Sequence, residues 1–153
     1  MRRLFLLIFA LLTAPALAED WGSYENARFG YMIDVPPGFS WGKEADNGDG
    51  RSFRSGATRL SVWGGNIVEP SFEGQVEAAM GLSAADGWAI TYHAVTPSWA
   101  GYSGSQAKRI LYQRMIALCD GAYAAFRLEY SAVEIGKLEL VVDRLVKSLK
   151  GDC

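Results

Sequence analysis

Histidine and cysteine are scarce in this chain of 153 residues, which has one histidine, His93, and two cysteines, Cys119 and Cys153. A single histidine without a cluster of neighbouring carboxylates is not the pattern of a catalytic zinc site. The two cysteines stand far apart and form no CxxC motif, and the sequence contains no Walker or dinucleotide-binding glycine pattern. We therefore predict neither a metal nor a cofactor.

Basic clusters and long apolar runs are also lacking. The chain has 15 basic and 17 acidic residues, and the basic residues are dispersed along it. A dispersed, slightly acidic balance disfavours binding to nucleic acid or to anionic lipid. Beyond residue 18, no apolar stretch approaches the roughly 20 residues that a transmembrane helix needs. The sequence thus predicts no nucleic-acid partner and no stable membrane insertion of the mature chain.

The N-terminal segment carries a clear targeting pattern. The pair Arg2-Arg3 precedes an apolar run from Leu4 to Leu12, and Ala16-Leu17-Ala18 follows. This order is typical of a secretory signal peptide with an A-x-A cleavage site. We predict that residues 1–18 are removed and that residues 19–153 form a single globular domain, located in the periplasm or secreted.

In an oxidising compartment, an even pair of cysteines most simply forms a disulfide bond. Cys119 stands just before a strand expected from about Tyr123 to Tyr130, and Cys153 just after a helix expected from about Ala132 to Leu149. If that helix packs back antiparallel on the strand, its end returns to the level at which the strand began. We predict a Cys119–Cys153 disulfide, and a pair of reduced or reactive thiols is the alternative.

Alternating apolar residues and turn signals predict a mostly antiparallel sheet. The dipeptide Asp120-Gly121 between two alternating runs predicts a long hairpin over residues 107–130. Both faces of its first strand are apolar, which predicts a central strand covered on both sides. Further strands are expected at residues 30–35, 51–54, 59–63, 88–92 and 99–102, whereas residues 19–28 are interpreted as a loosely held lead-in.

Two helices complete the predicted fold. Ser71 is the expected N-cap of a helix that stops at Asp86-Gly87. Ser131 and Glu134 fit a capping box for a second helix that extends to about Leu149. Its apolar residues recur at helical spacing: Ile135, Leu138, Val142, Leu145 and Leu149. The expected class is α+β, a mostly antiparallel sheet with two main helices packed on it.

The order of these elements resembles the PsbP-like fold, and residues Phe29–Phe39 resemble the opening pattern of that fold. The runs Glu44–Gly50 and Phe126–Tyr130 are similar to those of small uncharacterised secreted proteins of Gram-negative bacteria. Proteins with the PsbP-like fold serve as accessory or partner-binding proteins and share no catalytic centre. The resemblance therefore implies a binding role and transfers no functional residue to this chain.

Two segments superficially suggest calcium binding or catalysis. Asp46–Gly50 is dense in oxygen-bearing side chains, but an EF-hand alignment leaves its first and last ligand positions without one. Tight turns are the favoured interpretation, and a calcium site of another kind is left open. His93 with Ser103 or Ser105 suggests a base and a nucleophile, but the G-x-S-x-G pattern is incomplete. We predict no catalytic residue.

Aromatic residues are abundant, with five tryptophans and seven tyrosines. Trp63 precedes Gly64-Gly65, and Trp99 and Tyr102 flank Ala100-Gly101, so each lies next to conformationally permissive backbone. Such side chains dominate recognition surfaces. We predict Trp63, Trp99 and Tyr102 as ligand-binding residues, with packing in the core at strand ends as the alternative.

The sequence as a whole favours an exported, non-enzymatic accessory or binding protein that contacts an envelope protein or a small ligand. The alternative is a small envelope hydrolase whose carboxylates or serine converge only in the folded chain. Among the scattered carboxylates, Glu129 and Glu139 are the ones expected to lie near basic partners. A concavity holding titratable groups with strongly perturbed pKa values would favour the hydrolase. An aromatic or apolar surface would favour the binding protein.

Overall fold

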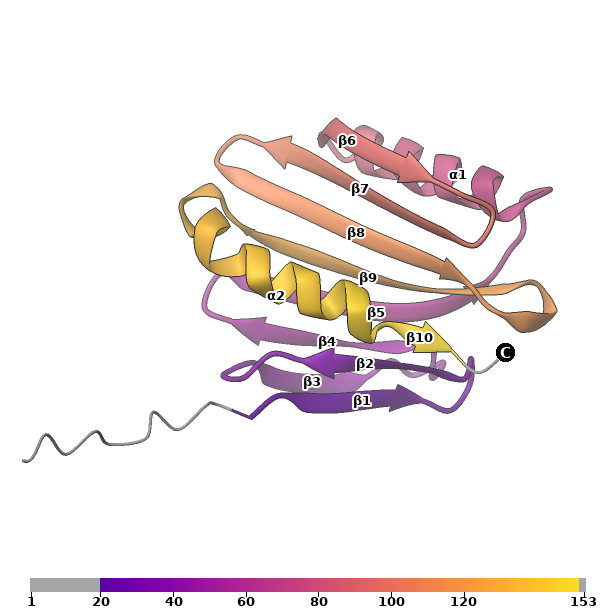
Figure 1. Cartoon of the computed structure of the whole chain (residues 1–153), viewed down its shortest axis with the longest axis horizontal. Helices are drawn as coiled ribbons and strands as arrows, with labels where there is room; N and C mark the ends of the chain where they lie inside the picture. Colours follow the sequence, from indigo (N-terminus) through magenta and orange to yellow (C-terminus); the bar gives the residue numbers. More distant parts are fainter. Residues whose placement is uncertain (1–19, 152–153) are drawn as a thin grey trace, which may run out of the picture.

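The computed structural model describes residues 20–151, which form two antiparallel sheets and two α-helices (Figure 1). The larger sheet has the strand order β3-β4-β5-β9-β8-β7-β6, and the smaller sheet has the order β1-β2-β10. The elements are β1 (Gly22–Asn26), β2 (Tyr31–Val35), β3 (Ser40–Glu44), β4 (Gly50–Ser55), β5 (Thr58–Asn66), α1 (Phe72–Ala85), β6 (Ala89–Val95), β7 (Trp99–Gln106), β8 (Arg109–Ala117), β9 (Ala122–Ser131), α2 (Ile135–Ser148) and β10 (Lys150–Gly151).

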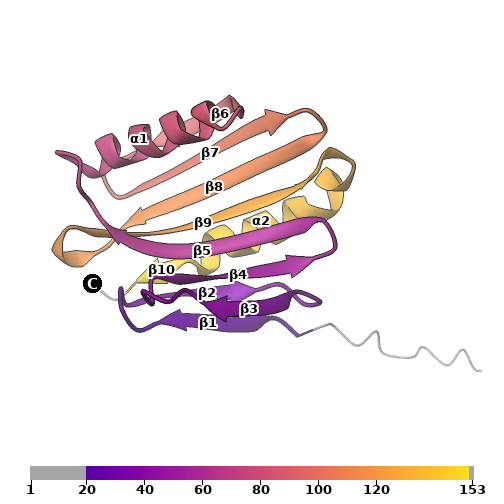
Figure 2. The same cartoon turned by 180° about the vertical axis from the view of Figure 1, so that it is seen from behind.

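The two helices cover opposite faces of the larger sheet, which confirms the predicted α+β class. In Figure 1, α2 lies in front of β5 and β9, and α1 lies behind β6 and β7. Figure 2 shows the same molecule from behind, with α1 on the near side. The main core lies between the larger sheet on one side and α2 with the smaller sheet on the other. A second core lies under α1.

Strand β8 is central and is covered on both sides, as its apolar pattern predicts. Ile110, Tyr112 and Ile116 pack into the main core on the α2 side of the sheet. Leu111 and Met115 pack into the core under α1 and are almost completely buried. Because successive side chains of a strand point to opposite faces, one apolar strand serves both cores.

The hairpin turn between β8 and β9 also follows its sequence signal. Asp120 and Gly121 both adopt a positive φ, of 59° and 69°. This left-handed conformation is the one that favours Asp-Gly in tight hairpin turns. The predicted hairpin is therefore confirmed at its turn as well as in its strands.

Helix α1 begins where its N-cap was predicted. The Ser71 hydroxyl accepts a hydrogen bond from the Gly74 amide at 3.1 Å. Phe72 and Val76 are buried against the sheet, and the helix ends at Ala85. An N-cap serine satisfies an amide that has no partner within the helix, which fixes the starting residue.

Helix α2 starts three residues later than its capping-box pattern predicts. Residues Ala132–Glu134 form a 3-10 turn, and neither Ser131 nor Glu134 caps the helix with its side chain. The Glu134 carboxylate instead accepts a hydrogen bond from the Thr58 hydroxyl at 3.3 Å. This contact with a distant residue replaces the capping hydrogen bond predicted between neighbours. Ile135, the first residue of the helix, is 54% exposed.

The polar N-terminal segment is a strand rather than a loose lead-in. Strand β1 pairs along its whole length with β2, and Tyr24 and Asn26 are both about 3% exposed. The Asn26 side chain donates to the Gly48 carbonyl at 2.9 Å and accepts from the Phe29 amide at 2.9 Å. The prediction failed because long-range hydrogen bonds, which have no signature in local periodicity, hold this segment in place.

Strand β3 was not predicted either. It pairs with β4, and its Trp41 ring packs edge-on against the Phe53 ring, with centroids 5.0 Å apart. Most of its residues are exposed, so the segment offers no apolar alternation. The larger sheet therefore extends one strand beyond the predicted edge.

Strand β6 contains a register shift between Ile90 and Tyr92 that inverts the faces expected from simple alternation. The sequence places Trp88 and Tyr92 on one face and His93 on the other. In the structure, Trp88 is buried under α1, whereas Tyr92 is 56% exposed. His93 pairs with Tyr102, whose side chain also lies under α1. A bulge adds one residue to a strand, and every later side chain changes side.

Several predictions fall on residues outside the described part of the chain. The predicted signal peptide, residues 1–18, precedes it, and Cys153 follows it. The Cys119–Cys153 disulfide therefore stays a prediction. Within the described residues, no helix is long and apolar enough to cross a membrane.

Candidate functional site

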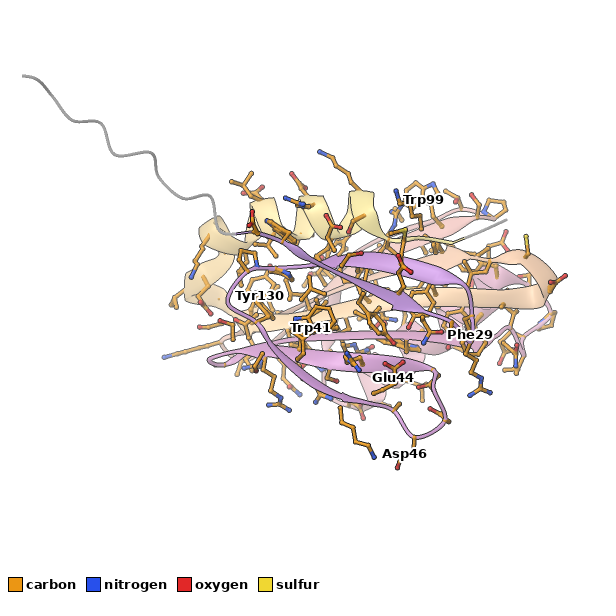
Figure 3. All side chains as sticks on the ribbon, turned by 90° about the horizontal axis from the view of Figure 1, so that it is seen from below. Phe29, Trp41, Glu44, Asp46, Trp99 and Tyr130 are labelled. Carbon is orange, nitrogen blue, oxygen red and sulfur yellow. The ribbon has the colours of Figure 1, made fainter. Side chains whose placement is uncertain are left out.

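The three aromatic residues predicted to bind ligand lie in three different environments. Trp99 is 36% exposed and lies on the side of the larger sheet that carries α2 (Figure 3). Trp63 is partly buried against the core under α1. Tyr102 is completely buried, and its hydroxyl lies 3.1 Å from the Ser83 hydroxyl. The Tyr102 side chain packs in the core, the alternative considered from the sequence, and leaves nothing for a ligand to touch at the surface.

Trp99 belongs to an open area of sheet that we call the β6–β8 face, defined by Tyr92, Trp99, Tyr112 and Arg114. Side chains of directly paired residues project from the same side of an antiparallel sheet. Tyr92 pairs with Ser103 and Ser103 with Tyr112, so both tyrosines share one side. The pair Trp99–Ile116 places Trp99 on that side, and Arg114 alternates with Ile116 along β8.

Gly101 makes room within the β6–β8 face. A methyl group at this position would come within 2.9 Å of the Tyr112 hydroxyl. The absence of a side chain lets the Tyr112 ring extend across β7, which buries it in part. The pKa of Tyr112 is raised, mainly by burial. The nearby Arg114 opposes this shift, whereas Tyr92 and Asp143 of α2 add to it.

Arg114 is the unusual member of the β6–β8 face. Its guanidinium carbon lies 4.3 Å from the centre of the Trp99 ring, close enough for a cation–π interaction. Its Nε atom is buried and has no hydrogen-bond partner. Burial lowers the pKa of Arg114, and the neighbouring Tyr112 partly opposes this. No carboxylate of the described residues lies within 4.0 Å of it, so a partly desolvated cation lies over an exposed indole without an acidic partner.

The β6–β8 face is open in the described part of the chain. Figure 1 shows α2 in front of β9 and β5 but no helix in front of β6, β7 or β8. Two large aromatic side chains, Tyr92 and Trp99, are therefore presented on paired strands rather than on loops. Such a surface can recognise an apolar or acidic group but contains no nucleophile–base pair.

A cavity of about 350 Å³ lies on β4 and β5 next to Trp63. It is lined by Lys43, Ala45, Asp49, Gly50, Arg51, Ser52, Arg59, Ser61, Val62 and Trp63. Trp63 pairs with Ala125, which packs in the core under α1, so the indole lies on the α1 side of the sheet. The two aromatic sites that stay accessible, around Trp63 and Trp99, are thus on opposite faces.

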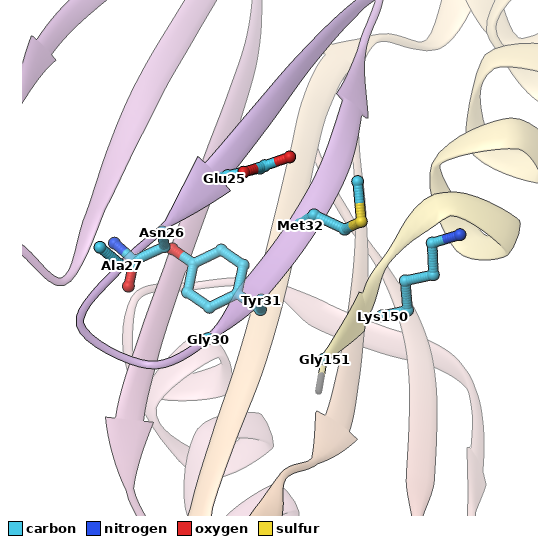
Figure 4. A pocket seen from close by; sticks show the side chains of 8 residues that line it. All are labelled: Glu25, Asn26, Ala27, Gly30, Tyr31, Met32, Lys150 and Gly151. Carbon is cyan, nitrogen blue, oxygen red and sulfur yellow. The ribbon is translucent and has the colours of Figure 1, made fainter. Parts of the chain in front are cut away.

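A larger cavity of about 720 Å³ lies on the smaller sheet (Figure 4). Its residues come from β1, the β1–β2 turn, β2 and β10, and they include one carboxylate, Glu25, and one ammonium group, Lys150. The last described residue, Gly151, forms part of its wall. Hydrolysis by paired carboxyl groups needs two of them, and the lining of this cavity supplies only Glu25.

The residues weighed for catalysis are not brought together. Because Ser103 pairs with Tyr92, and His93 with Tyr102, the serine and the histidine point to opposite faces of the sheet. Glu129 lies on the α1 side, 3.8 Å from both Arg109 and Arg127. Glu139 is on α2, on the opposite face of the sheet from Glu129. The pKa of Tyr130 is raised mainly by burial, and the charge of Glu139 adds to this shift.

The Asp46–Gly50 segment forms turns, as favoured from the sequence. The Gly48 amide donates to the Ala45 carbonyl at 2.8 Å, and the Asn47 side-chain amide donates to the Asp49 carboxylate at 2.8 Å. Among the described residues, no three or more His, Cys, Asp or Glu side chains gather in a group that could hold a metal ion.

Sequence reasoning missed Tyr92 and Arg114. The bulge in β6 hid Tyr92, because alternation placed it with the buried Trp88. Arg114 carried a usable signal, since it is a charged residue within the otherwise apolar face formed by Ile110, Tyr112 and Ile116. A charge inside a buried stripe is a departure that invites a functional explanation.

Comparison with known proteins shows the fold. No protein-family model matches the chain, and no curated protein sequence does. The solved structure of cyanobacterial PsbP (CyanoP) from Synechocystis sp. PCC 6803 is similar, with 13% identity, a TM-score of 0.67, and coverage of 91% of this chain and 96% of that one. The Ran-binding protein Mog1p of Saccharomyces cerevisiae is similar at 10% identity and a TM-score of 0.63, covering 88% and 96%. The PsbP-like fold expected from the sequence is thus confirmed, and at these identities the likeness concerns the fold alone.

Proposed function

We propose that this chain is an exported, non-enzymatic accessory protein that binds another protein of the bacterial envelope through its β6–β8 face. The observation that carries the proposal is the exposed Trp99 with Arg114 stacked on its ring and without a carboxylate partner. The similarity in fold to PsbP and to the Ran-binding protein Mog1p supports a binding role. The signal-peptide pattern of residues 1–18 supports export to the periplasm.

The chemistry of the face fits a protein partner. Tryptophan, tyrosine and arginine are the side chains that most often dominate the energy of protein interfaces. Here all three project from hydrogen-bonded strands, so little conformational entropy is lost when a partner docks. We infer that the partner places an acidic side chain against Arg114 and an apolar group against Trp99 and Tyr92. Arginine forms its strongest hydrogen bonds with carboxylates, and Arg114 has no carboxylate partner among the described residues.

Site-specific cross-linking in the periplasm tests the contact. A photoreactive residue replaces Tyr92 in one variant and Val133, which is 88% exposed in the turn before α2, in another. We expect one reproducible partner to be captured through position 92 and not through position 133. Capture of no protein above background, or equal capture from both positions, would contradict the proposal.

A second variant pair measures the role of the cation. Arg114→Gln should lower the recovery of the captured partner at least about tenfold, since charged hydrogen bonds at an interface are worth about 1.5–3 kcal/mol and 1.4 kcal/mol is a factor of about ten. Arg54→Gln is the matched control. Arg54 pairs with Arg59 on the α1 side of the sheet, opposite to the side that carries Arg114. Equal recovery with both variants would show that Arg114 is not part of the contact.

Export is tested separately. A chain that retains residues 1–18 should be recovered from the periplasmic fraction in a shortened form, and a chain without them should stay in the cytoplasm. Recovery of the full-length chain from the cytoplasm alone would contradict the export component and leave the binding surface to be judged on its own.

A further inference from the structure

We propose that the cavity beside Trp63 binds a small sugar that carries one acidic group, a carboxylate or a phosphate. This cavity lies on the face of the larger sheet opposite to the β6–β8 face, and its ligand does not depend on the proposed protein partner. Its volume of about 350 Å³ falls at the lower end of the range for small-molecule sites, roughly 300–1,000 Å³.

The floor of the cavity is a polar row on paired strands. Ser52 of β4 pairs directly with Ser61 of β5, and their hydroxyl oxygens are 3.5 Å apart. The Arg59 guanidinium lies 3.5 Å from the Ser52 hydroxyl. Because residues 59, 61 and 63 alternate along one strand, Arg59, Ser61 and Trp63 project from the same side. A guanidinium, a hydroxyl and an indole are therefore aligned at alternate positions of β5, with the Ser52 hydroxyl beside them on β4.

Trp63 is available as a stacking platform within this row. Its directly paired neighbour on β4 is Gly50, which has no side chain to cover the indole. Trp63 also packs against the core under α1, which holds the indole in place. A sugar ring presents C–H groups on its apolar face, and flat aromatic rings bind such faces through apolar contact.

The charges in the cavity favour an anion. Arg59 is exposed, and none of the described carboxylates lies within 4.0 Å of it. Asp49, the one carboxylate of the cavity lining, already accepts a hydrogen bond from the Asn47 side chain. Glu129 is the cross-strand neighbour of Arg59 but contacts Arg109 and Arg127 instead, so the Arg59 guanidinium can donate to a carboxylate or phosphate group of a ligand.

The other two cations of the lining have different roles. Lys43 contacts Asp46 at 2.6 Å, but both side chains are more than four-fifths exposed, so the pair is worth little and can open toward a ligand. Arg51 lies on the opposite side of β4, over the rings of Tyr24 and Trp41, and contacts Glu44 at 3.2 Å. Arg51 therefore has a structural role, and Arg59 is the residue that we assign to binding the acidic group of the sugar.

The test is an NMR titration of the mature chain with two charged sugars and their neutral counterparts. D-galacturonate is compared with D-galactose, and D-glucose 6-phosphate with D-glucose. We expect saturable shifts in the resonances of Ser52, Ser61 and the Trp63 indole with at least one charged sugar, at a Kd of about 1 mM or below. The two charged probes distinguish a carboxylate ligand from a phosphate ligand.

Variants then identify the recognising groups. Arg59→Gln should weaken binding of the charged sugar about tenfold, and Arg54→Gln, its exposed cross-strand neighbour outside the cavity, should leave binding unchanged. Trp63→Phe keeps an aromatic ring and should retain the fold, as monitored by circular dichroism, while weakening binding of the ring. Failure of both charged sugars to saturate, equal binding of charged and neutral sugars, or equal losses in the two arginine variants would overturn the proposal.

Discussion

The hydroxyl of Tyr24 joins strand β1 to the rest of the molecule, and its removal offers a sharp test of the fold. Tyr24 is 3% exposed, and its hydroxyl donates to the Glu44 carboxylate at 2.6 Å and accepts from the Asn26 side chain at 3.1 Å. Tyr24→Phe deletes both hydrogen bonds and keeps the ring, which packs edge-on against Phe53 with centroids 5.7 Å apart. The variant therefore isolates the polar contribution.

The expected cost follows from what each partner retains. A hydrogen bond to a carboxylate is worth about 1.5–3 kcal/mol and a neutral one about 1 kcal/mol. Glu44 keeps Arg51 at 3.2 Å and is 37% exposed, and Asn26 keeps the Gly48 carbonyl at 2.9 Å. The two values sum to about 2.5–4 kcal/mol, and neither partner is left unsatisfied. We therefore expect the free energy of unfolding to fall by about 2.5 kcal/mol, the lower end of the summed range.

Urea unfolding of a chain of residues 19–153 measures this change. The slope with denaturant should be unchanged, because the variant exposes the same surface on unfolding. Tyr92→Phe is the control, since Tyr92 is 56% exposed and the change should stay within about 0.5 kcal/mol. A Tyr24→Phe variant no less stable than Tyr92→Phe would refute the idea that this hydroxyl ties β1 to the β3–β4 region.

Two further predictions concern pH and the cysteines. Burial is the main cause that raises the pKa of Tyr24, Tyr31, Tyr112 and Tyr130 above the ordinary value of 10.0. The folded state therefore holds these protons more tightly. The contribution of the four tyrosines to stability should be constant up to about pH 9 and should then fall by up to about 1.4 kcal/mol per pH unit for each group above pH 10. Tyr31→Phe should reduce the slope of the free energy of unfolding against pH, measured by urea unfolding. If the predicted Cys119–Cys153 bond forms, titration of thiols in an unfolded, unreduced chain of residues 19–153 should detect none, and reduction should destabilise the chain by about 3–4 kcal/mol. Two titratable thiols before reduction would contradict the bond.

The elements that could be predicted from the sequence are those whose patterns are local. The alternation of β8, the Asp120-Gly121 turn and the Ser71 cap each reflect interactions within a few residues, and each is confirmed. Strand β1 and the start of α2 depend instead on partners distant in sequence. The Asn26 amide reaches Gly48, and the Thr58 hydroxyl recruits Glu134 away from its capping position. No local pattern encodes such contacts.

The candidate site shows the same division. Trp99 and Trp63 were identified by composition and by neighbouring glycines, and both remain next to accessible surfaces. Tyr102 had the same local signal but packs into the core, because whether a ring points in or out depends on strand register. The bulge in β6 reversed the side of Tyr92 for the same reason. Register is set by pairing across strands, and a single sequence does not specify it.

The smaller sheet joins the two ends of the described chain and thereby sets the order of assembly. Strand β10, at Lys150–Gly151, pairs with Met32 and Tyr31 of β2, and Leu145 and Leu149 close the main core over the same strand. Because a chain emerges from the ribosome N-terminus first, β2 must wait for residues 145–151 before these contacts can form. Closure of the main core therefore waits until both ends of the described chain are available, and it is a late step of folding.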